Sequence, residues 1–155
     1  MDAVEALASI HCEKPDAYIP RIETLAVDSP NHALLRSVLG YAIALNGQFQ
    51  RASEILDAIT HPAPGKKTAT PYAIALVLTG LNEKHDAVQW LEQSYRSGSL
   101  WSLGFPSDPM LKPLCDEPSY RTFLSKASYP APSHHSQMWE DSSAILMDGL
   151  QASGA

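Results

Sequence analysis

Residues 34–45, LLRSVLGYAIAL, carry the pattern that decides the predicted fold. Their large apolar side chains recur at spacings of three and four, which is typical of one buried face of an α-helix. The sequence SPN of residues 29–31 offers a cap and a first-turn proline, and the Asn-Gly pair at 46–47 offers a stop that tolerates left-handed backbone. We therefore predict a helix over about residues 31 to 46.

A second helix follows immediately, because the apolar residues from Phe49 to Ile59 repeat the same spacing. This helix must end at the sequence HPAPG of residues 61–65, where proline cannot continue it. Two helices joined by so short a turn form an antiparallel hairpin.

A second hairpin of the same plan follows downstream. Apolar residues between 72 and 81 form a buried face that begins after Thr70 and Pro71, and residues 82–84 make the turn into a partner helix over 87–95. No segment alternates apolar and polar residues between hairpin turns, so we predict no sheet. The expected fold class is therefore all-α.

A less regular pair of helices is expected upstream, over residues 3–11 and 16–27. Pro20 lies inside the second of them, and a proline belongs in the first turn of a helix. The true start of this helix is therefore expected between Ala17 and Ile19.

The two clear hairpins recur with a period of 35 residues, which separates Ala52 from Ala87. This is close to the 34-residue period of the tetratricopeptide repeat, and the chain resembles that family. The family's usual tryptophan and tyrosine are replaced by Arg36 and Ile43. The positions that match the family pattern are Leu39, Gly40, Gly47, Phe49, Ala52, Pro64, Ala75 and Ala87.

The resemblance implies a right-handed stack of two to three antiparallel helix hairpins, a tetratricopeptide-like solenoid, over roughly residues 17 to 97. It also implies that Ala52 and Ala87 are buried where neighbouring helices approach closely.

Residues 108–114, DPMLKPL, and 116–124, DEPSYRTFL, show a second resemblance. They look like the closing segment of tetratricopeptide domains attached to bacterial winged-helix transcriptional regulators and to some bacterial signalling proteins. Tyr120 stands where that family prefers phenylalanine. The resemblance implies a C-terminal capping segment, which a terminal repeat needs to cover its apolar face. The expected lid residues are Trp101, Phe105, Met110, Leu111 and Leu114.

The chain has 155 residues, of which 45% are hydrophobic, and is expected to form one domain with its own core. We place the repeat domain and its cap at residues 1–128, and a Pro/Ser/His linker with a short amphipathic tail helix at 129–155. The tail has too many large apolar side chains for an acidic extension in water. They are Met138, Trp139, Ile145, Leu146 and Leu150.

The tail is therefore expected to pack against the end of the repeat stack. Two alternatives stay open. The tail would act as a pseudo-ligand in the groove near Tyr41 and Tyr72, or it would exchange with a second copy and give a homodimer.

The charge balance limits the classes of partner. With 17 acidic and 11 basic residues, the formal net charge is −6, so the field would repel phosphate backbones and no nucleic-acid partner is expected. No stretch approaches the length of a membrane span, and the N-terminal residues lack the regions of a signal peptide. We expect a cytoplasmic protein with no membrane association.

No group of residues has the spacing of a catalytic or metal site. Residues 65–68, GKKT, resemble the end of a phosphate-binding loop, but Thr60 stands where that motif needs a glycine. Cys12 and Cys115 fit no closed four-ligand zinc site. We therefore expect no catalytic residue, no cofactor and no metal.

The first helix of each stacked tetratricopeptide hairpin lines a concave groove, which is where the family holds its ligands. The groove residues carried over by this resemblance are Leu34, Ser37, Tyr41, Ala44, Tyr72, Leu76 and Thr79. They are apolar or neutral, which favours a hydrophobic or aromatic-anchored peptide over a terminal carboxylate. The competing interpretation is that, in so short a stack, these residues belong to the core or lie under the tail.

The function implied by the resemblance is a non-enzymatic protein–protein interaction module, a scaffold or adaptor that binds a peptide or helix in the groove. One alternative is a regulatory or sensory fragment of a longer transcriptional regulator or signalling protein. The other is a small enzyme on a helical scaffold, which would need a deep pocket with converging polar groups.

Overall fold

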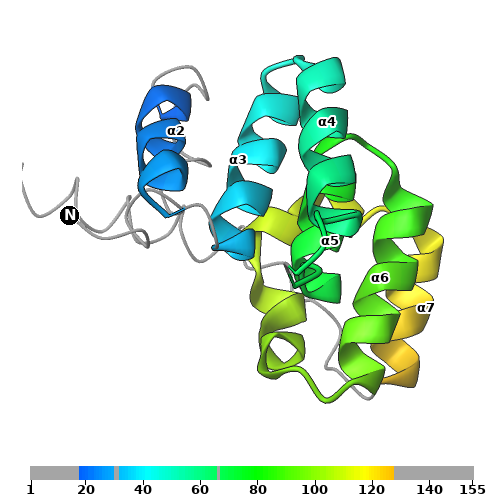
Figure 1. Ribbon diagram of the computed structural model, residues 1–155. Helices are drawn as coiled ribbons and strands as arrows, with labels where there is room; N and C mark the ends of the chain where they lie inside the picture. The colour runs from blue at the N-terminus through cyan, green and yellow to red at the C-terminus, as the bar shows by residue number, and fades with distance from the viewer. Residues whose placement is uncertain (1–17, 30–31, 66, 128–155) are drawn as a thin grey trace, which may run out of the picture.

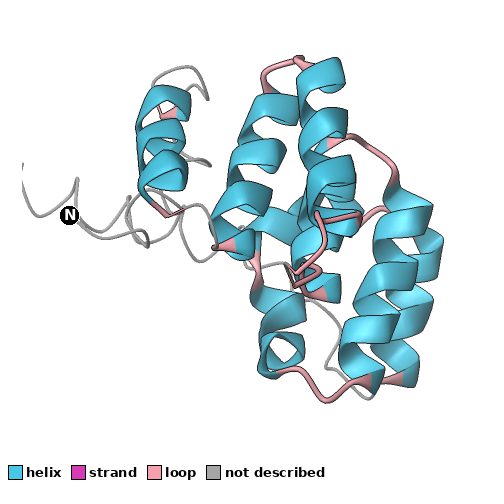
Figure 2. Ribbon diagram, viewed as in Figure 1, coloured by secondary structure: helices cyan, strands magenta, loops and turns pink. Residues whose placement is uncertain are grey.

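The computed structural model describes residues 18–29, 32–65 and 67–127 (Figures 1 and 2). Within these ranges the chain forms helices and connecting turns without any strand, which confirms the all-α class for this part of the chain. The helices are α2 (Ile19–Asp28), α3 (Ala33–Leu45), α4 (Phe49–Thr60), α5 (Pro71–Gly80), α6 (Lys84–Arg96) and α7 (Pro118–Lys126). Two 3₁₀ segments lie between α6 and α7, namely η2 (Leu100–Ser107) and η3 (Pro109–Leu114).

Both predicted hairpins are present, because α3 packs against α4 and α5 packs against α6. Each tight turn places one residue in left-handed backbone, Gly47 at φ 77° and Asn82 at φ 65°. Glycine has no side chain to clash there, and asparagine tolerates this region better than most residues. The turn residues therefore end α3 and α5 where the sequence predicted.

The two turns close with the same hydrogen bonds, 35 residues apart. The amide of Gln48 donates to the carbonyl of Ile43 over 3.1 Å, and the amide of Glu83 donates to that of Leu78 over 2.9 Å. These six-residue closures belong to the Schellman motif, which satisfies carbonyls that the end of a helix leaves unpaired. The 35-residue period of the sequence is thus also a period of the backbone.

Helix α5 forms the centre of the described structure, between α3, α4, α6 and η3. It contains no charged residue, and every side chain from Tyr72 to Gly80 is buried. Its start follows the predicted signal, since Pro71 lies in the first turn and the amide of Ala73 donates to Thr70 Oγ1 over 3.4 Å. An apolar helix without a polar face is stable only when neighbours surround it.

Small residues allow α5 to approach its neighbours closely. A Cβ atom added to Gly80 would lie 3.0 Å from the backbone of Tyr41, and one added to Gly40 would lie 3.1 Å from Val77. Ala52 and Ala87 are both completely buried, as predicted. These positions hold the helices at distances that larger side chains would not permit.

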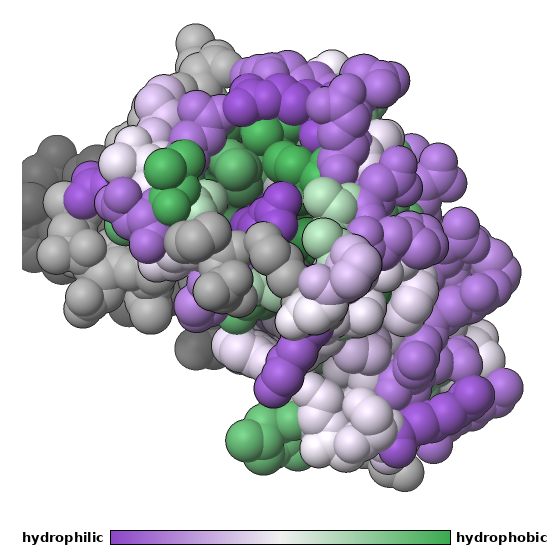
Figure 3. Space-filling model, in the orientation of Figure 1, coloured by the Kyte–Doolittle hydropathy of each residue, from purple (hydrophilic) through white to green (hydrophobic). Residues whose placement is uncertain are grey.

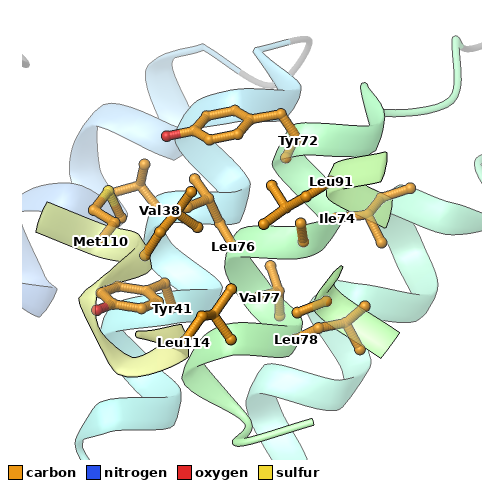
Figure 4. Close-up of a cluster of buried hydrophobic side chains, with 14 of the residues drawn as sticks. Val38, Tyr41, Tyr72, Ile74, Leu76, Val77, Leu78, Leu91, Met110 and Leu114 are labelled. Atoms are coloured by element: carbon orange, nitrogen blue, oxygen red, sulfur yellow. The ribbon is translucent and has the colours of Figure 1, made fainter. Parts of the chain in front are cut away.

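The segment that follows α6, where the sequence predicted a cap, packs on the core. Phe105, Met110, Leu111 and Leu114 are buried, whereas Trp101 is 49% exposed. Figure 4 shows Met110 and Leu114 beside core side chains from α3 and α5. Prolines interrupt this segment and favour short 3₁₀ turns over a continuous α-helix.

Some boundaries differ from expectation or fall outside the described ranges. Helix α3 begins at Ala33 instead of residue 31, because the Nδ1 atom of His32 caps it by accepting from the amide of Leu35. Helix α2 begins at Ile19, within the range expected from Pro20. The predicted helix over residues 3–11 and the predicted linker and tail helix of 129–155 lie outside the described residues.

Candidate functional site

The seven residues expected to line a groove lie mostly inside the core. Leu34 is half-buried, and the other six are 5% exposed or less, namely Ser37, Tyr41, Ala44, Tyr72, Leu76 and Thr79. Two of their polar side chains bond within their own helices. Ser37 Oγ donates to the carbonyl of Ala33 over 2.9 Å, and Thr79 Oγ1 donates to that of Ala75 over 2.8 Å. A partner could not reach these side chains without displacing other parts of the chain.

The segments η2 and η3 cover Tyr72, one of the predicted groove residues. The ring of Tyr72 stacks on that of Trp101 with centroids 5.2 Å apart, and on that of Phe105 at 5.9 Å. Its hydroxyl donates to Oδ2 of Asp108 over 2.5 Å, while Oδ1 of the same carboxylate accepts from the amide of Met110. The carboxylate of Asp108 therefore both caps η3 and links η3 to α5.

Burial and the nearby charge of Asp108 raise the pKa values of two tyrosines. Burial raises the pKa of Tyr41 from 10 to about 12, and the negative charge of Asp108 adds to the rise. Burial and the same carboxylate also raise the pKa of Tyr72 well above its usual range. Both hydroxyls therefore keep their protons near neutral pH, and that of Tyr72 donates its proton to Asp108.

Sequence reasoning missed the exposed face of η2. A 3₁₀ helix has three residues per turn, so residues three apart share a side. Ser102 and Phe105 point into the core, whereas Leu100 and Leu103 point outward and are 83% and 76% exposed. We call Leu100, Leu103 and the half-exposed Trp101 the η2 face. The sequence of residues 100–105 is rich in apolar residues, but it does not show which of them face the core and which face water.

The η2 face forms an apolar projection at one end of the molecule. Figure 3 shows hydrophobic side chains protruding at the lower end, where Figure 1 places η2. Another group of exposed apolar side chains lies on α2, at the left of the view, and at the α3–α4 turn, at the end opposite to η2. Its members are Leu25, Val27, Leu45 and Phe49. This second group provides matched controls for experiments on the η2 face.

Helices α6 and α7 end side by side at the end of the molecule that carries η2 (Figure 1). The hydroxyl of Tyr95, in the last turn of α6, donates to the carbonyl of Ala127 just after α7 over 3.4 Å. Each of these helices carries a cation in its last turn, Arg96 in α6 and Lys126 in α7, and both are exposed. Arg96 pairs with Glu92 over 3.2 Å on the surface, where such pairs contribute little.

The described ranges contain no cluster of three or more His, Cys, Asp or Glu side chains that could hold a metal ion. Nor does any helix in them have the length and apolar character needed to cross a bilayer. Comparisons with protein-family models, curated proteins and solved structures found no match to this chain.

Proposed function

We propose that this chain is a non-enzymatic protein-interaction module built on a tetratricopeptide-like stack of helix hairpins. The identical closures of Gln48 on Ile43 and of Glu83 on Leu78 support the repeat, as do the buried alanines at the same period. The burial of the central helix on all sides is what stacking of hairpins requires. A cytoplasmic location goes with this proposal, and cell fractionation tests it.

The docking surface that we propose is the η2 face and not the groove inferred from the resemblance. The observation that carries this is the exposure of Leu100 and Leu103 on one side of a segment whose other side is core. Burying a leucine against a partner is worth about 1.5–3 kcal/mol, so Leu100 and Leu103 can both act as anchors for a partner. Large exposed apolar patches mark interaction sites in soluble proteins.

The partner that fits this face is a peptide or amphipathic helix with large apolar side chains and acidic neighbours. The apolar side chains would cover Leu100 and Leu103, and carboxylates would meet Arg96 and Lys126. Charged groups at the rim of an interface contribute orientation and association rate more than affinity.

The proposal is tested by comparing what three immobilised versions of the full chain retain from native lysate. The versions are the unaltered chain, Leu100→Glu with Leu103→Glu, and Phe49→Glu as a matched control at the other end. Proteins retained by the unaltered chain and by Phe49→Glu, but lost from the double variant, support docking at the η2 face. Equal retention by all three versions would place binding elsewhere.

A second candidate is a regulatory segment of a longer protein, and the architecture of the cap favours it. Three residues of this cap come from the stretch that resembles the closing segment of regulator-associated repeats. Asp108 caps η3, and Leu114 is buried in the core. The hydroxyl of Tyr120 donates to the carbonyl of Phe105 over 2.9 Å. The test is whether the genomic reading frame continues upstream into a DNA-binding domain.

A further inference from the structure

We propose that the C-terminal tail, residues 128–155, folds back on its own chain and covers the η2 face. The proposal rests on the proposed function only in using the same surface. The tail would then be a built-in competitor for the partner, so the η2 face becomes available only when the tail leaves it.

The place where the described chain ends puts the tail next to this face. The carbonyl of Ala127 accepts from the hydroxyl of Tyr95, so α7 and α6 end side by side. Leu100 follows Tyr95 by five positions, a span of at most about 18 Å for a fully extended chain. The distance from the start of the tail to Leu100 is therefore at most this span plus the length of the Tyr95 side chain.

The linker is long enough to make the return. Residues 128–137 precede the first large apolar residues of the tail and include Pro130 and Pro132. At about 3.1 Å per residue in an extended proline-rich conformation, ten residues cover roughly 30 Å. This exceeds the span to Leu100, so the apolar part of the tail can lie on the face without strain.

The chemistry of the tail matches that of the face. Its apolar residues would cover Leu100 and Leu103, which are largely exposed to water, and the exposed half of Trp101. Five of these apolar residues are Met138, Trp139, Ile145, Leu146 and Leu150. The tail residues also include Glu140, Asp141 and Asp148 but no lysine or arginine, whereas Arg96 and Lys126 are exposed in the last turns of α6 and α7. Apolar burial supplies the attraction, and opposite charges orient the tail.

Other places for the tail are less suitable. The rings of Trp101 and Phe105 and the carboxylate of Asp108 already occupy the surroundings of Tyr72, so the predicted groove has no room there. Leu45 and Phe49 are exposed at the α3–α4 turn, which lies at the opposite end of the described structure from the C-terminus of α7 (Figure 1).

The test is site-specific photo-crosslinking in the full-length chain. One version carries p-benzoylphenylalanine at position 103 and the control carries it at position 49, both at exposed sites where the fold tolerates the change. After irradiation of a mixture of unlabelled and isotope-labelled protein, the crosslinked peptides are mapped by mass spectrometry. We expect position 103 to be joined to peptides from 128–155 of the same molecule, and position 49 not to be.

A tail variant checks that docking depends on apolar contact. Trp139→Ser with Leu146→Ser removes two large side chains, which lowers the docking equilibrium by about a hundredfold or more. The crosslink yield at position 103 should fall to that of position 49. Equal yields at both positions in the unaltered tail, or an unchanged yield in the tail variant, would overturn the proposal. Crosslinks that join labelled to unlabelled chains would overturn it in favour of a second copy as the occupant.

The two proposals fail separately. If the tail is crosslinked at position 103 but the lysate comparison retains no partner, the tail contact is supported and the proposed interaction function is wrong. If a partner is lost only from the Leu100→Glu, Leu103→Glu variant and no tail crosslink forms, the proposed function is supported and the tail contact is wrong.

Discussion

The hydroxyl of Tyr72 donates a 2.5 Å hydrogen bond to Oδ2 of Asp108, across 36 residues of sequence. This bond joins the central helix to the start of η3, and the other oxygen of the same carboxylate caps η3 through the amide of Met110. One side chain thus begins η3 and ties it to the central helix. A hydrogen bond to a charged acceptor in a partly buried place is stronger than a neutral one.

Tyr72→Phe is expected to lower the free energy of unfolding by about 1.5–3 kcal/mol, because the carboxylate of Asp108 loses a buried donor. Denaturant unfolding monitored by circular dichroism measures the change. Tyr95→Phe is the matched control, since its hydroxyl donates over 3.4 Å at an exposed site, and should change stability by less than about 0.5 kcal/mol. Equal losses in the two variants would contradict the anchoring role of Asp108.

Stability should fall at high pH because of the buried tyrosines. The pKa of Tyr41 in the folded chain is about 12, above its usual value of 10, so the folded state keeps a proton that the unfolded state loses. The stabilisation is complete below pH 10 and is lost as the pH rises toward 12, at up to about 1.4 kcal/mol per pH unit for this group. The pKa of Tyr72 is raised in the same direction, so it extends the loss to still higher pH.

Denaturant unfolding at several pH values above 9 gives the slope, and tyrosinate absorbance follows ionisation. The Tyr41→Phe variant should show a shallower decline above pH 10, since one of the two raised groups is gone. Parallel curves for the variant and the unaltered chain would show that Tyr41 ionises equally in both states.

Gly80→Ala should destabilise the fold by about 1–3 kcal/mol although alanine favours helices. The added Cβ would meet the Cα and carbonyl oxygen of Tyr41 at 3.0 Å, and backbone atoms cannot move aside as a side chain could. Gly104→Ala is the control, because nothing lies within 4 Å of its added Cβ. It should be neutral or stabilising by up to about 1 kcal/mol. Melting temperatures of the two variants test the close approach of α3 and α5.

Ser94→Ala should raise the free energy of unfolding by about 1 kcal/mol. Its buried hydroxyl has no hydrogen-bond partner among the described residues, and a buried unpaired polar group is unfavourable. Ser37→Ala gives the comparison, because that equally buried hydroxyl donates to the carbonyl of Ala33 and its loss brings no such gain. A loss of stability in Ser94→Ala would mean that the hydroxyl has a partner in solution.

Phe105→Ala should lower stability by about 3–5 kcal/mol, because it empties a core position beneath η2. Leu103→Ala, two residues earlier, should change stability by less than about 0.5 kcal/mol, since that side chain is 76% exposed. Thermal unfolding of the pair tests the phase of the 3₁₀ turns. Similar losses would show that Leu103 is covered in solution.

The hairpins, their turns and their buried alanines could be predicted from the sequence because each depends on residues close to one another in the chain. The apolar period of residues 34–45, the Asn-Gly stop and the Thr70 cap act within one or two helical turns. Burial of Phe105 and Leu114 also followed from sequence, since a terminal hairpin must cover its apolar side.

Only the tertiary structure decided which apolar residues are accessible. Tyr41 and Tyr72 lie on helices that would line a groove, but the segment after α6 folds back on them and joins Tyr72 through Asp108. That return depends on contacts between residues far apart in the chain, which leave no periodic signal in the sequence. In the same way, an apolar run such as that of η2 specifies burial in general, whereas packing against α5 and α6 fixes which of its sides meets the core and which meets water.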